Sequence, residues 1–553
     1  MNINELSAIA LSQLKKGKLQ EAEASYRQIL EIRPDDVNAL HFLGVVYYRL
    51  RRYDLAIRYI HKALLVQPNY VDAYSNLGLV LQETGRFDEA AACYEKSIAV
   101  NPGFFYAYHN LGNLNRENNE VEKAINYYQK ALQINPLFEP AHSNLLLYMC
   151  HSSRYDIHTI FAEHKHFAEL HEKPSSFAFK NYDLITDRIL RIGYVSPDFR
   201  RHSVAYFIEP VIMAHDKEQF EIFCYSTVDI EDDVTERLKK QAVCWRNISE
   251  MSDAQATECI QSDKIDILVD LAGHTANNRL LLFAQKPVPI QVNWIGYPAT
   301  SGLSAMDYRI VDRYTDPPGL TEQFYSEVLM RLPESFICYL PEICSPEVDR
   351  LPALFTGHIT FGSFNNVNKM SPEVSEAWID ILKAVENSHF VIKSKGLNIP
   401  KVRDNIMKVF RQGGISDQRI TLLAELPSTR EHLDVYNSID ISLDTFPYNG
   451  TTTTCESLWM GVPVITLTGT AYAARVGTSI LSNVGLPELI AGTADEYKSI
   501  AVNLAGDPER LQSLRGNLRT LMTRSPLCNA ERFTANVEIC YRKMWENWCT
   551  ACR

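Results

Sequence analysis

The chain has 553 residues, 46% of them hydrophobic and 22% charged, and a formal net charge of -12 at pH 7. A chain of this length is too long for one hydrophobic core, so we expect about three domains. The acidic balance excludes a protein that mainly binds a nucleic-acid backbone, but it leaves room for one nucleotide in a local pocket.

The N-terminal segment and the cysteines indicate the cellular compartment of the protein. The first 23 residues show no basic stretch followed by an apolar run, so we expect no signal peptide. No window holds the ~18 uncharged apolar residues of a membrane helix. The 12 cysteines are scattered through the predicted helices and strands, as reduced core thiols are. The sequence therefore predicts a cytoplasmic protein with no membrane contact.

The N-terminal part of the chain is built on a repeat of 34 residues. Proline, leucine, glycine and alanine recur at this step, as Pro34, Pro68, Pro102 and Pro136; Leu43, Leu77, Leu111 and Leu145; Gly44, Gly78 and Gly112; and Ala22, Ala56, Ala90 and Ala124. This period, with small residues at fixed places, is typical of tetratricopeptide repeats. The small residues let two helices approach closely, and proline ends the second helix of each repeat. We predict a tetratricopeptide array over residues 1–150.

Such an array forms a superhelix whose concave face consists of the first helices of the repeats. The residue before the repeated leucine should face this groove, and in three repeats it is an asparagine: Asn76, Asn110 and Asn144. A row of amides offers donors and acceptors to an extended peptide backbone. We predict that these asparagines bind a protein or peptide. The alternative is that asparagine is only tolerated on a wet surface.

Residues 151–187 lose the repeat register and are predicted to form a helical linker that is rich in histidine. His158, His164, His166 and His171 form no recognised metal-ligand pattern with a carboxylate, so we interpret them as a solvated helix face. We predict no metal site in the chain.

From residue 188, short β-branched runs alternate with helical segments, which indicates doubly wound parallel sheets. The predicted strands fall into two series, one at 189–195, 220–226, 264–271, 289–295 and 308–312 and one at 358–364, 389–394, 419–426, 439–445 and 463–469. Two series in tandem predict two Rossmann-like lobes, residues 188–345 and 346–553, the second closed by a C-terminal helix. The expected fold is an α-solenoid followed by this α/β module. Ligands bind beyond the carboxyl ends of such strands, so the polar residues there are the candidate site.

Two histidines follow predicted strands of the first lobe. His202 lies in a polar segment after the strand at 189–195, and His274 lies after the strand at 264–271. A histidine at a strand end acts as an acid, a base or a hydrogen-bond donor near neutral pH. Either one alone would be interpreted as structural, but their equivalent places in the topology favour a catalytic role.

The segment 444–456 of the second lobe carries the sharpest signal. A strand ends, a Pro/Gly turn follows, and threonines at 451–453 open a helix. Hydroxyls and free N–H groups at a helix N-terminus form an anion site that suits phosphate. Glu456 is positioned for ribose hydroxyls, and Lys369 for the charge of a departing diphosphate. The alternative is a threonine-capped helix without a ligand. No GxxxxGK[ST] motif is present, and no GxGxxG follows the first strand, which disfavours a P-loop ATPase and a dehydrogenase.

Five long segments resemble blocks of the O-linked N-acetylglucosamine transferase and SPINDLY family. They are LRIGYVSPDFRRHSV, DILVDLAGHTANNRL, QVNWIGYPATSGL, FGSFNNVNKMSP and LDTFPYNGTTTTCESLWMGVPVITL. The match spans essentially the whole chain, and the repeats precede the lobes as in that family. The resemblance implies a GT-B fold and an inverting, metal-independent transfer that needs no cofactor. It also implies serine and threonine hydroxyls on proteins as acceptors.

The resemblance further implies roles for single positions. His202 matches the active-site histidine of the first lobe, and His274 matches a second histidine common in bacterial members. Lys369 matches the lysine that contacts the donor diphosphate. The implied nucleotide-binding positions are Asn366, where animal enzymes have a glutamine, His432, the paired threonines Thr452 and Thr453, and their neighbours Thr451 and Glu456.

Three positions depart from the animal enzymes of this family. Thr429 stands in place of a lysine, Thr451 in place of a histidine and Glu456 in place of an aspartate, and the large insert between the lobes is absent. In these respects the sequence is similar to SPINDLY and its bacterial relatives, and plant SPINDLY uses GDP-fucose. The resemblance therefore implies UDP-N-acetylglucosamine (UDP-GlcNAc) as the first donor and GDP-fucose as the alternative.

The expected reaction is a single displacement at the sugar, with a protein or peptide acceptor held in the repeat groove. Two other interpretations stay open. The chain is then either a tetratricopeptide scaffold with inactive lobes, or a transferase for glycans or small molecules whose repeats serve only assembly. A homodimer formed through the repeats is compatible with each of the three.

Overall fold

The computed structural model describes residues 2–172, 179 and 182–553. It divides into two compact units, residues up to Leu145 and Leu146–Arg553, and each is described by itself. Residues 173–178 and 180–181 of the predicted linker and residue 1 of the predicted array lie outside the described residues.

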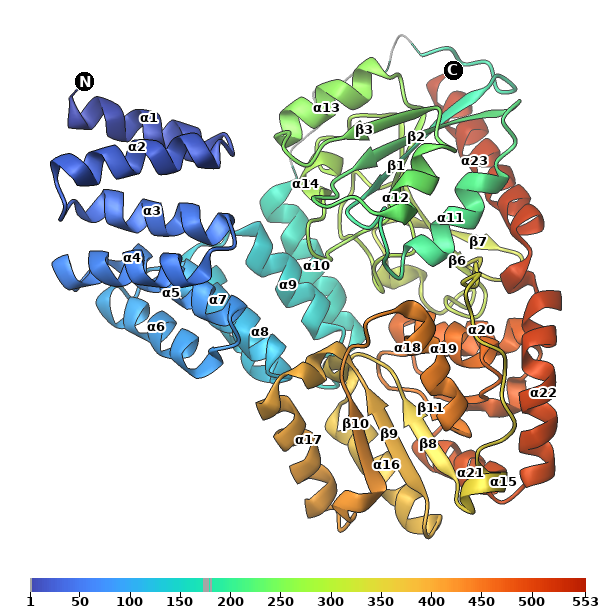
Figure 1. Cartoon of the computed structure of the whole chain (residues 1–553). Helices are drawn as coiled ribbons and strands as arrows, with labels where there is room; N and C mark the ends of the chain where they lie inside the picture. The colour runs from blue at the N-terminus through green and yellow to red at the C-terminus, as the bar shows by residue number, and fades with distance from the viewer. Residues whose placement is uncertain (1, 173–178, 180–181) are drawn as a thin grey trace. The chain divides into compact units, whose positions relative to one another are not determined.

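The first unit consists of helical pairs (Figure 1, blue). The pairs are α1 Ile3–Lys15 with α2 Leu19–Ile32, α3 Val37–Arg49 with α4 Tyr53–Val66, α5 Val71–Glu83 with α6 Phe87–Val100, and α7 Phe105–Glu117 with α8 Val121–Ile134. A ninth helix, α9 (Glu139–Met149), begins the partial fifth repeat. The second helix of each pair ends two residues before the repeated proline. The predicted tetratricopeptide array is confirmed.

The repeated glycines are the points where paired helices touch. A Cβ placed on Gly78 would lie 2.4 Å from the ring of Tyr94, and one on Gly112 would lie 2.4 Å from the ring of Tyr128. In the second repeat the position equivalent to Tyr94 is Ile60, and its side chain fills the space beside Gly44. The glycine is therefore required because it admits a large partner from the neighbouring helix.

The second unit contains two parallel sheets. The first has the strand order β3-β2-β1-β4-β5-β6-β7, with β1 Leu190–Ser196, β2 Phe220–Ser226, β3 Cys244–Asn247, β4 Ile267–Asp270, β5 Ile290–Asn293, β6 Tyr308–Asp312 and β7 Val328–Leu332. The second has the order β10-β9-β8-β11-β12-β13, with β8 Thr360–Ser363, β9 His389–Lys393, β10 Ile420–Leu423, β11 Ile441–Leu443, β12 Val464–Leu467 and β13 Ile490–Ala491. All ten predicted strands are present. The structure adds β3, β7 and β13, which lie at the edges of the sheets.

Helices cover the faces of both sheets, as the alternating pattern requires. Those around the first sheet are α10 Ile157–His171, α11 Ala205–Ala214, α12 Asp233–Lys239, α13 Asp253–Ser262 and α14 Leu280–Phe283. The helices that come after β7 in the chain are α15 Ala353–Thr356, α16 Pro372–Ala384, α17 Pro400–Gln412, α18 Thr429–Asp434, α19 Thr452–Trp459, α20 Val476–Val484, α21 Ala494–Ala505, α22 Pro508–Arg524 and α23 Ala530–Cys552. The expected α-solenoid followed by two Rossmann-like lobes is the observed fold.

The last helix departs from the expected division into lobes. The sequence assigned residues 346–553 to the second lobe, but α23 packs into the core of the first, at the right of Figure 1. The Tyr541 hydroxyl lies 3.1 Å from that of Tyr194 on β1, and the Trp545 indole N–H donates to the Ile185 carbonyl at 3.0 Å. The chain thus crosses between the lobes a second time, just before α23.

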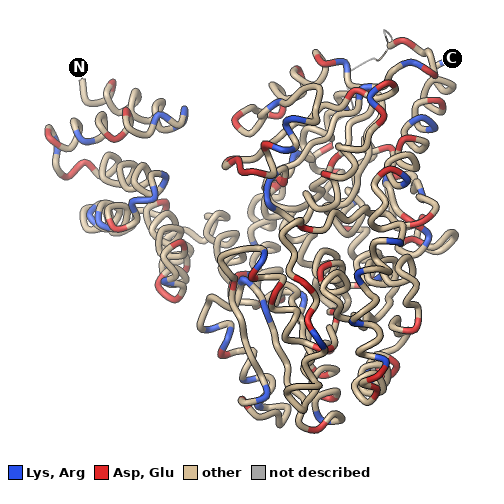
Figure 2. Tube along the Cα trace, turned by 45° about the vertical axis from the view of Figure 1, so that its right-hand side comes forward, with Lys and Arg blue, Asp and Glu red and all other residues tan. Residues whose placement is uncertain are grey.

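Residues of both charges are distributed along the whole chain. In the view of Figure 2, acidic and basic residues are interspersed along helices and loops, and no basic stripe is visible. None of the helices in the described part of the chain combines the length and the hydrophobicity that a bilayer span needs.

Replacing a repeat glycine should destabilise the array. Gly78→Ala forces the Tyr94 ring to move, and such overpacking costs about 1–3 kcal/mol. Gly516→Ala is the matched control, because Gly516 lies inside α22 with open space where a Cβ would stand. That substitution should stabilise its helix by up to about 1 kcal/mol. Calorimetric unfolding of the full chain measures both, and equal effects of the two substitutions would contradict the packing argument.

Candidate active site

A cavity of about 250 Å³ lies between the two lobes of the second unit. Its walls come from both lobes, as expected for a site beyond the carboxyl ends of parallel strands. The first lobe contributes His202 and the loop 295–298, and the second contributes residues after β8 and β11. Six of the predicted site residues line this one cavity: His202, Asn366, Lys369, Thr451, Thr452 and Thr453.

The turn after β11 is organised by one buried carboxylate. Asp444 is 1% exposed and accepts four hydrogen bonds. The donors are the backbone N–H groups of Thr445 (2.9 Å) and Gly450 (2.7 Å), the Asn365 amide (3.1 Å) and the Thr466 hydroxyl (2.8 Å). Burial raises the pKa of Asp444 to about 6, although these donors act in the opposite direction. The carboxylate therefore fixes both ends of the turn that precedes α19.

Asn365 connects this carboxylate to the predicted phosphate site. Its amide nitrogen donates to Asp444, and its amide oxygen accepts the Thr453 hydroxyl at 2.7 Å. A Cβ on Gly450 would stand 2.4 Å from the Thr453 hydroxyl oxygen and 2.7 Å from the Asn365 amide oxygen, so no other residue fits there. The first N–H groups of α19 have no partner within the helix and are available to an anion.

Lys369 points its ammonium at the same turn. Nζ donates to the Asn449 carbonyl at 2.8 Å and lies 3.9 Å from the centre of the Tyr448 ring. Burial lowers the pKa of Lys369 to about 8, and the charge of Asp444 opposes this shift. The cation is thus held over an aromatic face, beside the N-terminus of α19.

His432 and Glu456 form a second group, next to the cavity and outside its lining. His432 Nε2 lies 3.0 Å from a Glu456 carboxylate oxygen, which also accepts the Tyr436 hydroxyl at 3.3 Å. The Lys393 ammonium hydrogen-bonds His432 Nδ1. An ammonium only donates, so the proton of a neutral ring sits on Nε2 and points at Glu456. The carboxylate predicted for ribose is therefore held by two side chains, and Lys393 holds one of these, His432, from its other nitrogen.

His202 is positioned by Asp198, which follows β1. His202 Nδ1 accepts the Val204 backbone N–H at 3.3 Å and lies 3.3 Å from an Asp198 carboxylate oxygen. Burial lowers the pKa of His202, and Asp198 partly offsets this. Burial also raises the pKa of Asp198. With Nδ1 accepting the Val204 N–H, the proton of a neutral ring sits on Nε2; in the other ring form, with the proton on Nδ1 and directed at Asp198, Nε2 is the proton acceptor.

His274 does not line the cavity. It is 1% exposed, and Nε2 lies 3.0 Å from the Ser301 carbonyl, so this nitrogen carries the proton. Its ring packs edge-on against Phe167 of α10, with 4.6 Å between centroids. His274 follows β4, the neighbour of β1 in the sheet, as the sequence predicted. Through its hydrogen bond to Ser301, His274 helps to position the loop that precedes this residue. A direct catalytic role of His274 stays a prediction.

The histidines of the linker were expected on a solvated helix face, and for His164 this is wrong. His164 is fully buried, and its Nε2 lies 2.8 Å from the Tyr297 hydroxyl. Gly302 also packs against the backbone of His164. Helix α10 is therefore fixed to the loops that carry the first-lobe wall of the cavity.

The three repeat asparagines form a regular set of contacts within the first unit. Each amide nitrogen reaches a polar side chain 35 residues earlier in the chain: Asn76 to His41 (2.8 Å), Asn110 to Ser75 (3.1 Å) and Asn144 to His109 (3.2 Å). Burial lowers the pKa of both His41 and His109 to about 4, so these rings are neutral acceptors. The asparagines thus link consecutive repeats, and Asn110 is itself buried. Peptide binding by this row stays a prediction.

Asp198, Asn365 and Lys393 were not predicted as functional residues. Each follows or ends a strand, and the sequence offered only that signal. Their partners lie 4, 88 and 39 residues away, respectively.

Comparison with known proteins now identifies the group to which the chain belongs. The model of glycosyl transferase family 41 matches residues 116–339 and 349–537, and tetratricopeptide models match residues 6–36, 35–102 and 75–137. The chain belongs to glycosyl transferase family 41. The suspected relationship to O-linked N-acetylglucosamine transferases and SPINDLY proteins is thereby confirmed.

Relatives within family 41 include plant proteins and one solved structure. A Petunia hybrida protein named probable UDP-N-acetylglucosamine–peptide N-acetylglucosaminyltransferase SPINDLY is 46% identical over 367 residues, or 66% of this chain and 39% of that protein. The Arabidopsis thaliana protein with the corresponding name SEC is 33% identical over 376 residues, or 65% and 38%. The chain thus spans about two fifths of the length of these curated relatives. A mutant O-GlcNAc transferase of Thermobaculum terrenum is 34% identical, with a TM-score of 0.82 over 100% of this chain and 98% of that one.

The role of Asp444 in this family 41 site is testable with a matched control. Asp440 and Asp444 flank the same strand, β11, and Asp440 is likewise buried and accepts two backbone N–H groups, at 2.9 and 2.8 Å. An asparagine keeps one acceptor oxygen and loses the other, so both Asp→Asn variants should lose about 1–3 kcal/mol of stability. Only Asp444→Asn should also weaken the binding of a nucleotide sugar, about tenfold, as measured by calorimetry. Equal affinities of the two variants would contradict the assignment.

Proposed function

We propose that this chain transfers a sugar from a nucleoside-diphosphate sugar to serine or threonine hydroxyls of polypeptides, with inversion and without a metal ion. One observation carries the proposal. The Lys369 ammonium and the N-terminus of α19 line the same 250 Å³ cavity as His202 of the other lobe. An anion site on one side and a proton acceptor on the other suit a displacement in which a diphosphate leaves.

The second lobe stabilises the leaving group in this proposal. Lys369 supplies a positive charge, and Thr452 and Thr453 supply backbone N–H groups at the helix N-terminus. These donors are fixed in advance by Asp444 and Asn365, so they do not have to reorganise as charge develops on the diphosphate. Together they provide the positive potential that a metal ion provides in other transferases.

The first lobe handles the acceptor in this proposal. The acceptor oxygen forms a bond to the anomeric carbon while the bond from that carbon to the diphosphate breaks. The hydroxyl proton passes to Nε2 of His202 in the ring form whose Nδ1 proton is directed at Asp198, 3.3 Å away. A lowered pKa keeps His202 neutral near pH 7, which is the state that accepts a proton.

UDP-GlcNAc is the first donor that we propose, and the names of the relatives support it. GDP-fucose is the second, because the nucleotide end of the site departs from the animal pattern at Thr429, Thr451 and Glu456. The Arg201 guanidinium of the first lobe donates to the Thr429 hydroxyl at 3.1 Å, so a positive charge from the other lobe stands where animal enzymes have a lysine.

The repeat array is the proposed site for the acceptor polypeptide. Support comes from the even spacing of Asn76, Asn110 and Asn144 and from their common orientation toward the preceding repeat. Asn76 uses one amide hydrogen in its contact with His41, so its other hydrogen and its oxygen are available to a peptide backbone.

The affinity for a nucleotide sugar should fall as the pH rises through 8. Lys369, with its pKa lowered to about 8, loses its charge there, and each further pH unit reduces the charged fraction about tenfold. Lys369→Arg keeps the charge and should give a flat profile, while Lys369→Met should bind weakly at every pH. Calorimetric titration between pH 7 and pH 10 measures this. A flat profile for the unmodified chain would remove the leaving-group role of Lys369.

Transfer itself is tested by incubating the full chain with UDP-GlcNAc or GDP-fucose and a protein acceptor, then measuring the intact acceptor mass. We expect an added hexosamine or deoxyhexose, a loss of at least a hundredfold with Lys369→Met, and a smaller loss with His202→Ala. If nucleotides do not raise the melting temperature of the chain in a thermal-shift assay, the scaffold interpretation is favoured. Sugar on glycans and on no protein would favour the third interpretation.

A further inference from the structure

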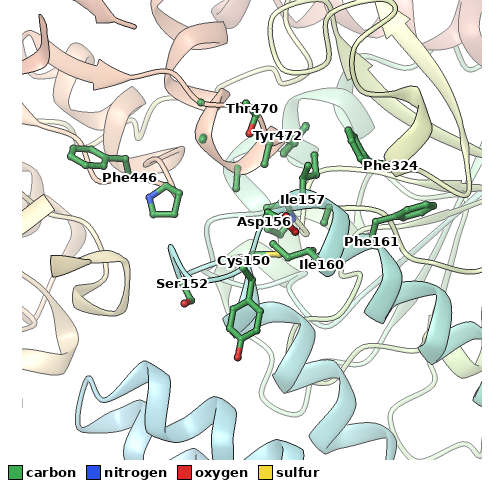
Figure 3. Close-up of a pocket in the computed structure, with 18 of the residues that line it drawn as sticks. Cys150, Ser152, Asp156, Ile157, Ile160, Phe161, Phe324, Phe446, Thr470 and Tyr472 are labelled. Carbon is green, nitrogen blue, oxygen red and sulfur yellow. The ribbon is translucent and has the colours of Figure 1, made fainter. Parts of the chain in front are cut away.

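A second cavity, of about 310 Å³, lies next to the proposed catalytic cavity (Figure 3). It is bounded by residues 150–161 at the start of α10, by first-lobe loops at 298–300 and 324–325, and by second-lobe turns at 446–447 and 467–474. Apolar and aromatic side chains such as Ile160, Phe161 and Phe324 make up most of the lining. The one charged lining side chain is Asp156, which caps the exposed start of α10.

The two cavities are adjacent and share part of their walls. Pro298 and Tyr472 line both of them. The turn after β11 separates them: Phe446 and Pro447 face the larger cavity, and Tyr448, over which the Lys369 ammonium lies, faces the catalytic one. A molecule that reacts in the catalytic cavity can therefore place a neighbouring group in this apolar space, because only about the width of one side chain separates the two cavities.

Tyr472 gives an independent sign of an occupant. It is 4% exposed, and its hydroxyl has no hydrogen-bond partner among the residues that the structure describes. The Arg309 guanidinium lies 4.8 Å from the centre of its ring and donates to the Tyr297 carbonyl at 2.6 Å, so the ring is held from behind. A buried hydroxyl without a partner is costly, so this wall of the cavity carries an unsatisfied polar group.

We propose that this cavity is an acceptor subsite that takes an uncharged, bulky side chain, aliphatic or aromatic, two or three residues from the modified hydroxyl. The inference rests on the proposed function and deepens it by naming an acceptor preference. An extended chain covers about 7–10 Å in two or three residues, which matches the adjacency of the two cavities. The volume lies at the small end of the roughly 300–1,000 Å³ range of ligand pockets, as suits one side chain.

The donor does not account for this cavity. Its diphosphate and ribose are assigned to Lys369, the α19 N-terminus and Glu456, and the larger cavity has no lysine or arginine in its lining to hold a phosphate. Asp156 at the rim disfavours acidic side chains. The lining therefore selects by size and apolarity, the two properties that vary most among the residues that flank a serine in a polypeptide.

The test compares peptides that carry one serine and differ only in a flanking residue, Leu, Phe, Ala or Glu. The measured quantity is the ratio of kcat/KM for the Leu or Phe peptide to that for the Ala peptide, with either donor. We expect a ratio of about tenfold for the unmodified chain, the effect of filling an apolar pocket, and a ratio below one for the Glu peptide. Ile160→Trp fills the cavity and should bring the apolar ratio close to one. Ala162→Trp, on an exposed position of the same helix, is the matched control and should keep it.

A ratio near one in the unmodified chain, or a tenfold ratio that survives Ile160→Trp, overturns the subsite. No transfer to any peptide overturns the proposed function instead, so the two failures are distinct. If Ile160→Trp does not fold, a peptide with benzoylphenylalanine at the flanking position is photo-crosslinked to the unmodified chain. Crosslinks to residues 150–161 or 467–474 support the proposal, and crosslinks confined to other segments overturn it.

Discussion

The buried carboxylate of Asp444 is the interaction on which the arrangement of the site depends. It draws together the two ends of the turn 444–450, the end of β12 through Thr466, and the loop after β8 through Asn365. A carboxylate that is buried this completely needs hydrogen-bond donors on both oxygens, because a buried charge without partners would strongly destabilise the fold. The same charge lies near Lys369 and supports its protonated state. One side chain thus fixes both the helix N-terminus and the cation beside it.

Burial shifts the polar groups of both lobes toward their neutral forms. In the second lobe the cation is partly desolvated and its pKa is lowered to about 8, while the acid behind it has a pKa raised to about 6. In the first lobe His202 and Asp198 shift toward their neutral forms for the same reason. Charges in such surroundings act strongly on a reacting group because little water screens them.

The sequence was informative where the signal is periodic or local. The 34-residue period predicted the helical pairs, and β-branched runs predicted the strands that are central in each sheet. The edge strands β3 and β7 were missed because CWRN is short and polar, and VLMRL lacks a clear alternation. The turn with threonines 451–453 was recognised because a helix N-terminus has local chemistry.

His164 was misjudged, because its burial comes from Tyr297 in a segment 133 residues away. Asn365 and Lys393 were missed for the same reason, and α23 was assigned to the wrong lobe because amphipathic spacing does not say which sheet the helix covers.

The return of α23 to the first lobe has a mechanical consequence. The chain passes between the lobes once after β7 and again after α22, and the two passages touch where the Tyr339 N–H donates to the Leu527 carbonyl at 2.6 Å. Arg532 at the start of α23 pairs with Glu334 on the first passage. Two passages fastened side by side hold the lobes together at this edge of the second unit, so sliding one passage along the other would break both contacts.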